Sequence, residues 1–399
     1  MKRTARATRA IAGALVAATL AWSSAALADE PIAVLFVGNS YTFGRVDPVM
    51  SYNAANVHDL TAAFYVASPT GANPWEPHPW GGVPGIFKQL TVEAGLNYDV
   101  SISARNAASL RGQFLNTANA AWDLRGNVAS RRWDVVVLQE QSDAALPVGR
   151  GKNANPATFV AYANQFERFI HDGAAQTYTE TQLFGSLAAC QATGLSATSC
   201  NTKRVIPQNT NASAATRVYL TETWARPDMV YAHKTTVADS TTPDGSPIPD
   251  GTGVDATLYY SNLAGMTADL RAAFAAAAAG NPRFAGVSPV GDAFQRAYDL
   301  GIVKTEDFYT ASGAYAPPRP GDRMDLWWKD YLHASKYGSY LDALVQFGTI
   351  TGLDPRSFGP METAARDLGI AVNDALMLQW VASAELGFAG ALPGRRPGR

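Results

Sequence analysis

The sequence predicts a three-layer α/β/α sandwich built around a central, mostly parallel sheet of five strands. Short apolar runs of strand length recur at wide spacing, and segments of helix length separate them. Strands that alternate with helices form parallel sheets with helices on both faces. In such a sheet, ligands and catalytic groups collect outside the carboxyl ends of the strands.

The predicted elements follow in chain order. The strongest strand predictions are Ile32–Val37 and Val135–Leu138, because both are continuous apolar runs. Three weaker runs complete the sheet: Tyr98–Ser103, Arg217–Thr221 and Phe284–Val287. We expect the main helices between them at Pro84–Ala94, Pro156–His171 and Ser261–Ala279.

Two segments interrupt this alternation. The first, at about 46–82, is dense in Pro, Gly and Trp, and the second, at about 235–253, has the composition of an exposed loop. Long loops within a domain often form lids or binding loops. Trp75 and Trp80 could therefore line a substrate pocket, or they could only hold a surface loop in place. We expect a single domain over 29–399, with a helical tail from about Thr349.

The composition indicates a globular, exported protein. The 399-residue chain is 47% hydrophobic, 17% charged and has a net charge of −2, so it can bury a substantial core but offers no basic surplus for nucleic acid. Residues 1–28 have a basic start, an apolar run and a small-residue cleavage pattern, which predicts a signal peptide rather than a membrane anchor. We therefore expect a secreted or periplasmic protein without a membrane anchor after cleavage. The oligomeric state stays open.

The only two cysteines, Cys190 and Cys200, lie close together in the sequence. In an exported chain this spacing favours a disulfide over two free thiols. Cofactors and metals are not expected, because the chain has no glycine-rich phosphate loop and no cluster of His and Cys at ligand spacing. Asp322 and Asp325 near His333 do not change this, since no second histidine stands at ligand spacing.

Three residues suggest nucleophilic catalysis. Ser40 follows the first predicted strand, which places it at the carboxyl edge of the sheet. A serine hydroxyl needs a base to take its proton and a third group to orient that base. Among the five histidines, His333 stands out, because Asp330 precedes it by three residues. An Asp-x-x-His pair is weak evidence by itself, and its combination with Ser40 strengthens it.

These stretches resemble the sequence blocks of the GDSL/SGNH hydrolase superfamily. GNSYT at 38–42, VVVLQEQS at 135–142 and DYLH at 330–333 resemble its serine, third-strand and Asp-x-x-His blocks, in the order that the superfamily requires. LTETWARPDM at 220–229 and FAGVSPVGDAF at 284–294 also resemble segments of a secreted bacterial branch. The resemblance implies a flavodoxin-like fold, and it extends over nearly the whole mature chain.

The resemblance also implies roles for individual residues. Ser40 would attack an ester carbonyl and donate its own N–H to the oxyanion, His333 would be the general base, and Asp330 would orient it. The second block departs from the family pattern, since Asn106 and Ala107 stand where a glycine N–H is expected, and we choose Ala107 as the donor.

The third block departs as well, with glutamines in place of the asparagine of the family. A glutamine carries the same carboxamide on a longer stem, so Gln141 or Gln139 could donate, and we prefer Gln141 because it lies further past the strand. The remaining residues expected in a substrate pocket are Asn39, Tyr41, Asn106, Gln139, Trp75 and Trp80. Arg226 is a candidate neighbour of the site, while Trp224 is expected in the core.

The sequence thus favours a secreted serine esterase without a cofactor, a carboxylic ester hydrolase of class EC 3.1.1, acting on a small or polymeric ester. A narrower alternative is an O-acetyl esterase of a polysaccharide or glycan. An alternative of another class is a non-catalytic exported protein that binds carbohydrate or aromatic rings through its Trp-rich loop.

Overall fold

The computed structural model describes residues 30–63, 78–116, 123–235 and 248–388. Its centre is a sheet of six parallel strands in the order β10-β7-β4-β1-β3-β2. The strands are β1 (Ile32–Gly38), β2 (His58–Asp59), β3 (Tyr98–Ala104), β4 (Val135–Gln139), β7 (Arg217–Thr221) and β10 (Phe284–Ser288). This is the predicted three-layer α/β/α class.

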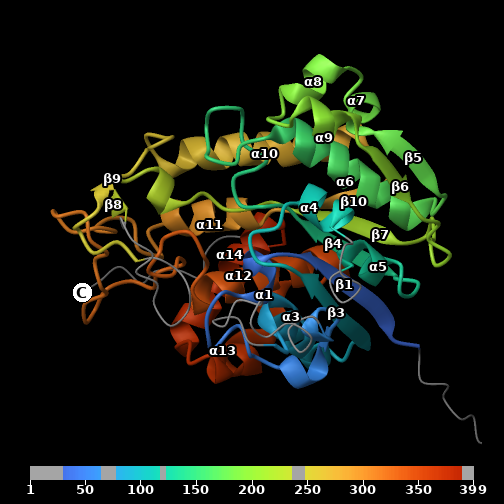
Figure 1. The fold of residues 1–399 in the computed structure, drawn as a ribbon. Helices are drawn as coiled ribbons and strands as arrows, with labels where there is room; N and C mark the ends of the chain where they lie inside the picture. Colours follow the sequence, from blue (N-terminus) through green and yellow to red (C-terminus); the bar gives the residue numbers. More distant parts are fainter. Residues whose placement is uncertain (1–29, 64–77, 117–122, 236–247, 389–399) are drawn as a thin grey trace, which may run out of the picture. The chain divides into compact units, whose positions relative to one another are not determined.

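Helices cover both faces of the sheet. In Figure 1, α4, α6 and α10 lie above the sheet, and α3, α12 and α13 lie below it. The principal helices are α3 (Gly82–Glu93), α4 (Leu110–Leu115), α5 (Leu124–Val128), α6 (Pro156–His171), α10 (Leu263–Gly280), α11 (Val290–Asp299), α12 (Lys336–Thr351), α13 (Thr363–Asp367) and α14 (Val372–Glu385). Helix α6 has the predicted bounds, and α3 and α10 differ from the predicted helices by one or two residues at each end.

The sixth strand corrects the predicted count of five. Strand β2 has only two residues, His58 and Asp59, and pairs with Ser101 and Ile102 of β3 at the edge of the sheet. It lies inside the first interrupting segment, after the short helix η1 (Ala54–Asn56). A polar pair of residues has no strand periodicity, so this strand arises from pairing with its neighbour and has no local sequence signal.

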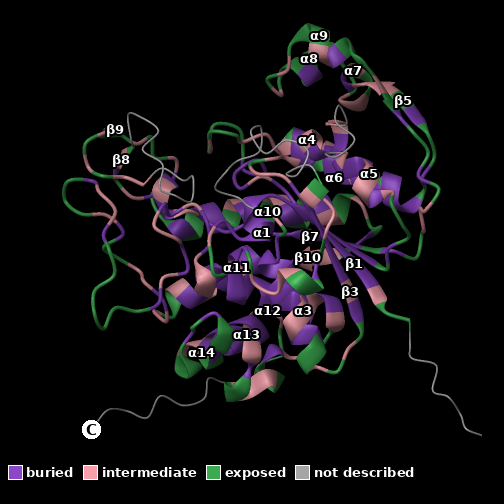
Figure 2. Ribbon diagram, turned by 60° about the horizontal axis from the view of Figure 1, so that its bottom comes forward, coloured by how far each residue is buried: buried purple, intermediate pink, exposed green. Residues whose placement is uncertain are grey.

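The inner strands are buried on both faces, as parallel strands covered by helices must be (Figure 2). The register pairs Gly38 of β1 with Ala104 of β3, and Val37 of β1 with Leu138 of β4. The three strands therefore end at one edge of the sheet. The chain segments that leave them, at 39–43, 105–109 and 140–142, meet there.

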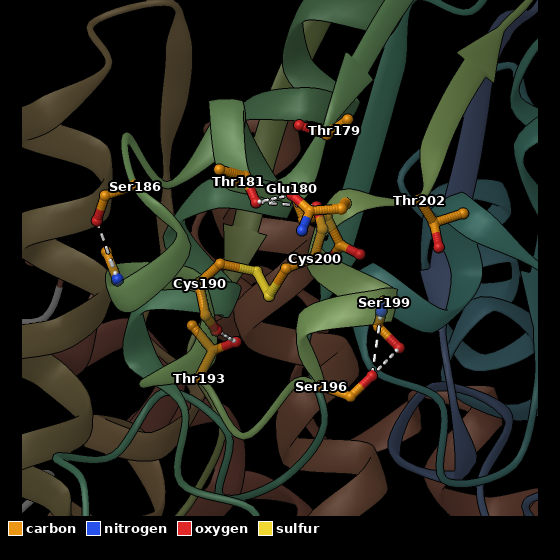
Figure 3. Close-up of a disulfide and its surroundings, with 12 residues drawn as sticks. Thr179, Glu180, Thr181, Ser186, Cys190, Thr193, Ser196, Ser199, Cys200 and Thr202 are labelled. Atoms are coloured by element: carbon orange, nitrogen blue, oxygen red, sulfur yellow. Dashed lines mark hydrogen bonds between the residues drawn. A yellow bond between two sulfur atoms is a disulfide. The ribbon is translucent and has the colours of Figure 1, made fainter.

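A separate excursion carries the disulfide. Strands β5 (Gln176–Thr179) and β6 (Lys203–Ile206) form an antiparallel pair, and α7 (Glu180–Leu183), α8 (Leu187–Gln191) and α9 (Ala197–Asn201) lie between them in the chain. Cys190 of α8 and Cys200 of α9 are joined, and both are fully buried (Figure 3). The expected disulfide is therefore present.

A buried carboxylate ties this excursion to the rest of the molecule. Glu180 accepts hydrogen bonds from Arg111 Nε and Nη2 at 2.6 and 2.8 Å, from Tyr162 Oη at 2.7 Å and from Arg204 Nη2 at 2.7 Å. These partners come from α4, α6 and β6. Burial alone would raise the pKa of Glu180, but these hydrogen bonds lower it to about 2.

The last part of the described chain is helical, with η4 (Pro355–Met361) preceding α13 and α14. Two short strands, β8 (Lys234–Thr235) and β9 (Val254–Asp255), flank the second interrupting segment. The predicted signal peptide and Trp75 lie outside the described residues. None of the helices in the described ranges is long and apolar enough to cross a membrane.

Candidate active site

Ser40 is the first residue of the short helix α1 (Ser40–Phe43), directly after the tight turn that follows β1. Asn39 caps this helix, because its Oδ1 accepts the N–H of Tyr41 at 3.0 Å. The preceding Gly38 has no room for a side chain, since a Cβ would lie 1.9 Å from Thr42 Oγ1. The sequence Gly-Asn-Ser therefore forms a turn that holds the serine at the carboxyl edge of the sheet.

Ser40, His333 and Asp330 form one hydrogen-bonded chain. The distance from Ser40 Oγ to His333 Nε2 is 2.8 Å, and the distance from His333 Nδ1 to Asp330 Oδ2 is 2.6 Å. All three residues are buried, with exposed fractions of 6 to 7%. Asp330 and His333 lie on the loop before α12. His333 is separated from Ser40 by 293 residues in the sequence.

The electrostatics of Asp330 keep this carboxylate ionised. Its burial alone would raise the pKa, but the His333 ring and the backbone N–H groups of Leu332 and His333 lower the pKa below its ordinary value. An ionised Asp330 must accept from His333 Nδ1, so this nitrogen carries the proton. In the neutral ring, Nε2 is then left as an acceptor for the Ser40 hydroxyl proton.

Two aromatic residues hold the loop that carries His333. Tyr41 Oη and Trp224 Nε1 both donate to the carbonyl of Leu332, at 2.9 and 3.1 Å. Their rings stack with centroids 3.9 Å apart and an interplanar angle of 7°. Trp224 also stacks on Phe294 and is buried, as expected for a core residue. The loop is thus fixed directly against the residue that follows Ser40.

Two backbone N–H groups near Ser40 are without partners. The N–H of Ser40 is the first of its helix, where no intrahelical acceptor exists. Ala107 has a φ of 56°, an uncommon conformation for a residue with a Cβ, and it lies in the turn that follows β3. Within the described ranges, neither N–H donates a hydrogen bond. Both residues line the cavity in front of Ser40.

The two glutamines of β4 and the following loop occupy different places. Gln139 is buried below the Ser40 turn, where its Oε1 accepts from the Asn39 N–H at 3.0 Å and from Thr42 Oγ1 at 3.1 Å. Gln141 lies on the cavity wall, and its Nε2 donates to Ser142 Oγ at 3.1 Å. Of the two candidates left open by the sequence, only Gln141 therefore faces the cavity, and Gln139 supports the turn from behind.

Glu140, between these glutamines, connects the three segments that meet at the site. Its Oε1 accepts from the N–H groups of Leu110 at 3.0 Å and Gln141 at 2.6 Å. Its main-chain carbonyl accepts from Asn39 Nδ2 at 3.5 Å. Burial raises the pKa of the Glu140 carboxyl to about 7.

The cavity around Ser40 has a volume of about 360 Å³. It is lined by Ser40, Asp330, His333, Ala107 and Gln141, by the expected residues Asn39, Tyr41 and Asn106, and by Arg45, Ser142, Asp228, His233, Thr235, Pro249 and Leu332. Trp80 does not line it. Instead Trp80 is buried, stacks on Phe43 with centroids 4.0 Å apart and packs behind the Ser40 turn.

A partly buried arginine organises one side of the cavity. Arg226 donates to both carboxylate oxygens of Asp228, at 3.0 and 2.6 Å, and to Ser142 Oγ at 2.9 Å. Burial raises the pKa of Asp228, and the charge of Arg226 opposes this effect. The arginine thereby anchors a carboxylate in the cavity wall. Within the described ranges, no cluster of three or more His, Cys, Asp or Glu is arranged to hold a metal ion.

Asp228, His233 and Arg45 line the cavity but were not predicted as site residues from the sequence. Asp228 and His233 follow β7, whose carboxyl end at Thr221 lies at the same edge of the sheet as that of β1. Their position after the end of a strand was thus the only sequence signal that could have indicated them. It was not decisive, because no pattern in 222–235 distinguishes cavity residues from core residues.

Comparisons with known proteins give fold-level likeness alone. No protein-family model matches the sequence, and no curated protein matches it. Among solved structures, a candidate SGNH hydrolase from Slackia heliotrinireducens is 17% identical, with a TM-score of 0.35 over 80% of this chain and 100% of that one. A DUF4886 family protein from Bacteroides uniformis is 13% identical, with a TM-score of 0.42 over 90% of this chain and 95% of that one. The chemistry of the site therefore rests on the geometry of its residues.

Proposed function

We propose that this protein is a serine esterase that hydrolyses carboxylic esters through an acyl-enzyme on Ser40. The observation that carries this proposal is the hydrogen-bonded chain Ser40–His333–Asp330, which opens into a cavity next to two N–H groups that have no partner among the described residues. A nucleophile, a base and an orienting acid beside donors for an oxyanion are the parts that acyl transfer requires.

In the acylation step, Ser40 Oγ attacks the ester carbonyl carbon while His333 Nε2 takes the hydroxyl proton. The carbonyl oxygen becomes an oxyanion, which accepts hydrogen bonds from the N–H groups of Ser40 and Ala107. When the intermediate collapses, the C–O bond to the alcohol breaks, and His333 gives its proton to the departing oxygen. Asp330 stabilises the imidazolium throughout.

In the deacylation step, a water molecule takes the place of the alcohol. His333 removes a proton from it, and the resulting oxygen attacks the acyl carbon. Collapse breaks the bond to Ser40, which recovers its proton from His333, and the carboxylic acid leaves. Gln141 serves as a third oxyanion donor if its Nε2 exchanges Ser142 Oγ for the substrate oxygen. No step needs a cofactor.

The test is labelling and turnover of matched serine variants. We expect a fluorophosphonate to label Ser40 stoichiometrically, and Ser40→Ala to abolish both labelling and hydrolysis of 4-nitrophenyl acetate without loss of thermal stability. Ser51→Ala is the control, since Ser51 is exposed and outside the cavity. Turnover by the folded Ser40→Ala protein would contradict the proposal. Ligand binding without labelling would favour the non-catalytic sugar- or aromatic-binding alternative.

A narrower candidate is an O-acetyl esterase of a glycan. Three polar side chains in the cavity wall favour it, because a long alkyl chain would desolvate Arg45, Asn106 and Asp228 without replacing their hydrogen bonds. A series of 4-nitrophenyl esters from acetate to octanoate discriminates the two. A maximum of kcat/KM at acetate supports the acetyl esterase, and a maximum at octanoate excludes it.

We also propose that the chain works outside the cytoplasm. The joined and fully buried Cys190–Cys200 pair fits an oxidising compartment. Fractionation of cells that express the whole chain checks this, with N-terminal sequencing of the exported protein expected to begin at residue 29.

A further inference from the structure

A second histidine, His233, lines the cavity that holds Ser40. Its ring is held in place from two sides. Nδ1 lies 2.9 Å from the carbonyl oxygen of Tyr231, and the ring stacks on Tyr309 with centroids 4.5 Å apart and an interplanar angle of 11°. Tyr231 is itself fixed, because its ring stacks on Phe308. The imidazole therefore has one defined orientation.

The hydrogen bond to Tyr231 determines what the other ring nitrogen offers. A carbonyl oxygen has only lone pairs, so Nδ1 of His233 must carry a proton. In the neutral ring, Nε2 is consequently an acceptor. Within the described ranges, this nitrogen has no hydrogen-bond partner. His233 lines the cavity, so its Nε2 is an acceptor that a bound ligand can use.

The neighbouring carboxylate, Asp228, is also a hydrogen-bond acceptor. Both oxygens of Asp228 are held by Arg226, but a carboxylate oxygen has more than one lone pair and can accept again. Asp228 and His233 therefore both offer acceptors to the cavity. The groups around Ser40 and Ala107 instead offer N–H donors, which suit a carbonyl oxygen. A matching substrate would have an ester carbonyl and, at a second position, a hydrogen-bond donor.

We propose that His233 is a specificity-determining residue, whose Nε2 accepts a hydrogen bond from a hydroxyl group of the substrate. The site would then prefer esters that carry a free hydroxyl near the scissile bond over plain alkyl esters. This inference rests on the proposed esterase function, and it adds the chemical class of the substrate and the residue that recognises it.

The first measurement needs no variant. It compares kcat/KM for ethyl acetate with kcat/KM for 2-hydroxyethyl acetate, whose alcohol has the hydroxyl, and for ethyl glycolate, whose acyl group has it. Each value is divided by the rate constant for alkaline hydrolysis, which removes differences in intrinsic reactivity. We expect at least one hydroxylated ester to exceed ethyl acetate about 5- to 10-fold, as suits one buried hydrogen bond. No preference for either would overturn the proposal.

Matched variants then assign the preference to Nε2. The side chain of His233→Asn can still donate to the Tyr231 carbonyl but has no acceptor at the position of Nε2, whereas His233→Gln can place its carboxamide oxygen there. We expect the Asn variant to lose the preference and the Gln variant to retain part of it, where the preference is the ratio to kcat/KM for ethyl acetate in the same variant. His58→Asn is the control, because the His58 side chain is 67% exposed at the far edge of the sheet.

The outcomes separate this inference from the proposed function. An unchanged preference in folded His233→Asn protein overturns the inference and leaves the esterase intact. If Ser40 is not labelled and no ester is hydrolysed, the proposed function fails, and the inference fails with it. Thermal unfolding of each variant shows whether it is folded, and if the Asn variant is not, the wild-type comparison still decides.

Discussion

Replacement of Glu140 tests whether the proposed oxyanion donors depend on a single buried carboxyl group. Glu140 Oε1 accepts the N–H groups of Leu110 and Gln141, and its carbonyl accepts from Asn39. Glu140→Ala removes the side-chain acceptor and leaves two N–H groups without partners. Glu140→Gln keeps an oxygen in the same place but cannot ionise. The pair of variants therefore separates the hydrogen bonds from the charge.

The magnitudes follow from the structure. Each buried N–H left unpaired costs about 1–3 kcal/mol, so Glu140→Ala should lower the free energy of unfolding by about 2–6 kcal/mol at pH 5. Because burial raises the pKa from 4.5 to about 7, the folded protein binds more protons than the unfolded chain between these values. The wild type should therefore lose stability as pH rises through this window and level off above it. Between pH 5 and pH 8, the free energy of unfolding of Glu140→Gln should rise by about 2–3 kcal/mol relative to that of the wild type.

Urea unfolding at both pH values measures these differences, and kcat for 4-nitrophenyl acetate measures the effect on the site. We expect kcat to fall about 10- to 100-fold in Glu140→Ala, less than the loss of a whole oxyanion donor, and to change little in Glu140→Gln. Glu306→Gln is the control, because Glu306 is exposed. A pH-independent difference between Glu140→Gln and wild type would refute the reasoning about the charge, and an unchanged kcat in Glu140→Ala would refute the positioning role.

Three further predictions concern the triad and the disulfide excursion. Asp330→Asn should lower kcat about 10³- to 10⁴-fold, because the amide no longer holds the imidazole in the required tautomer, and wild-type turnover would contradict this. Since the pKa of Glu180 is lowered to about 2, its stabilisation is present above pH 4.5 and lost as pH falls towards 2. As pH falls through this range, the wild type should lose about 2–3 kcal/mol of unfolding free energy that Glu180→Gln does not lose. Urea unfolding measures this, and parallel pH profiles of the two proteins would contradict the prediction. Replacement of Cys190 and Cys200 by Ala should cost about 2–3 kcal/mol, measured by urea unfolding under non-reducing conditions, whereas equal stabilities would show that the closed loop of 10 residues constrains nothing.

The sheet and the position of Ser40 at its edge could be predicted because their signals are local. A continuous apolar run such as Ile32–Val37 specifies a strand buried on both faces, and the strand end then places Ser40 at the edge where sites form. Strand β2 could not be predicted, because its pairing depends on the exposed edge of β3 and on no property of His58 or Asp59. The choice between Gln139 and Gln141 also needed the structure, since strand alternation puts both on one face.

The rest of the cavity depends on contacts between distant segments. His233 reaches the cavity because Tyr309, more than seventy residues later, stacks against it. Trp80 shows the opposite case, in which a residue expected in a pocket wall is buried beside Phe43. A tryptophan gains from burial in either place, so its presence in a loop does not tell which surface it covers.

The hydrogen bond from Tyr41 to Leu332 closes a small ring, since Tyr41 follows Ser40 in the chain and Leu332 precedes His333. Two neighbouring hydrogen bonds, Tyr41–Leu332 and Ser40–His333, thus join the turn after β1 to the loop before α12. These four residues hold Ser40 Oγ and His333 Nε2 close together across the nearly three hundred residues that separate them in the sequence. Because both hydrogen bonds lie at the carboxyl edge of the sheet, the loop before α12 and the turn after β1 are held as one unit.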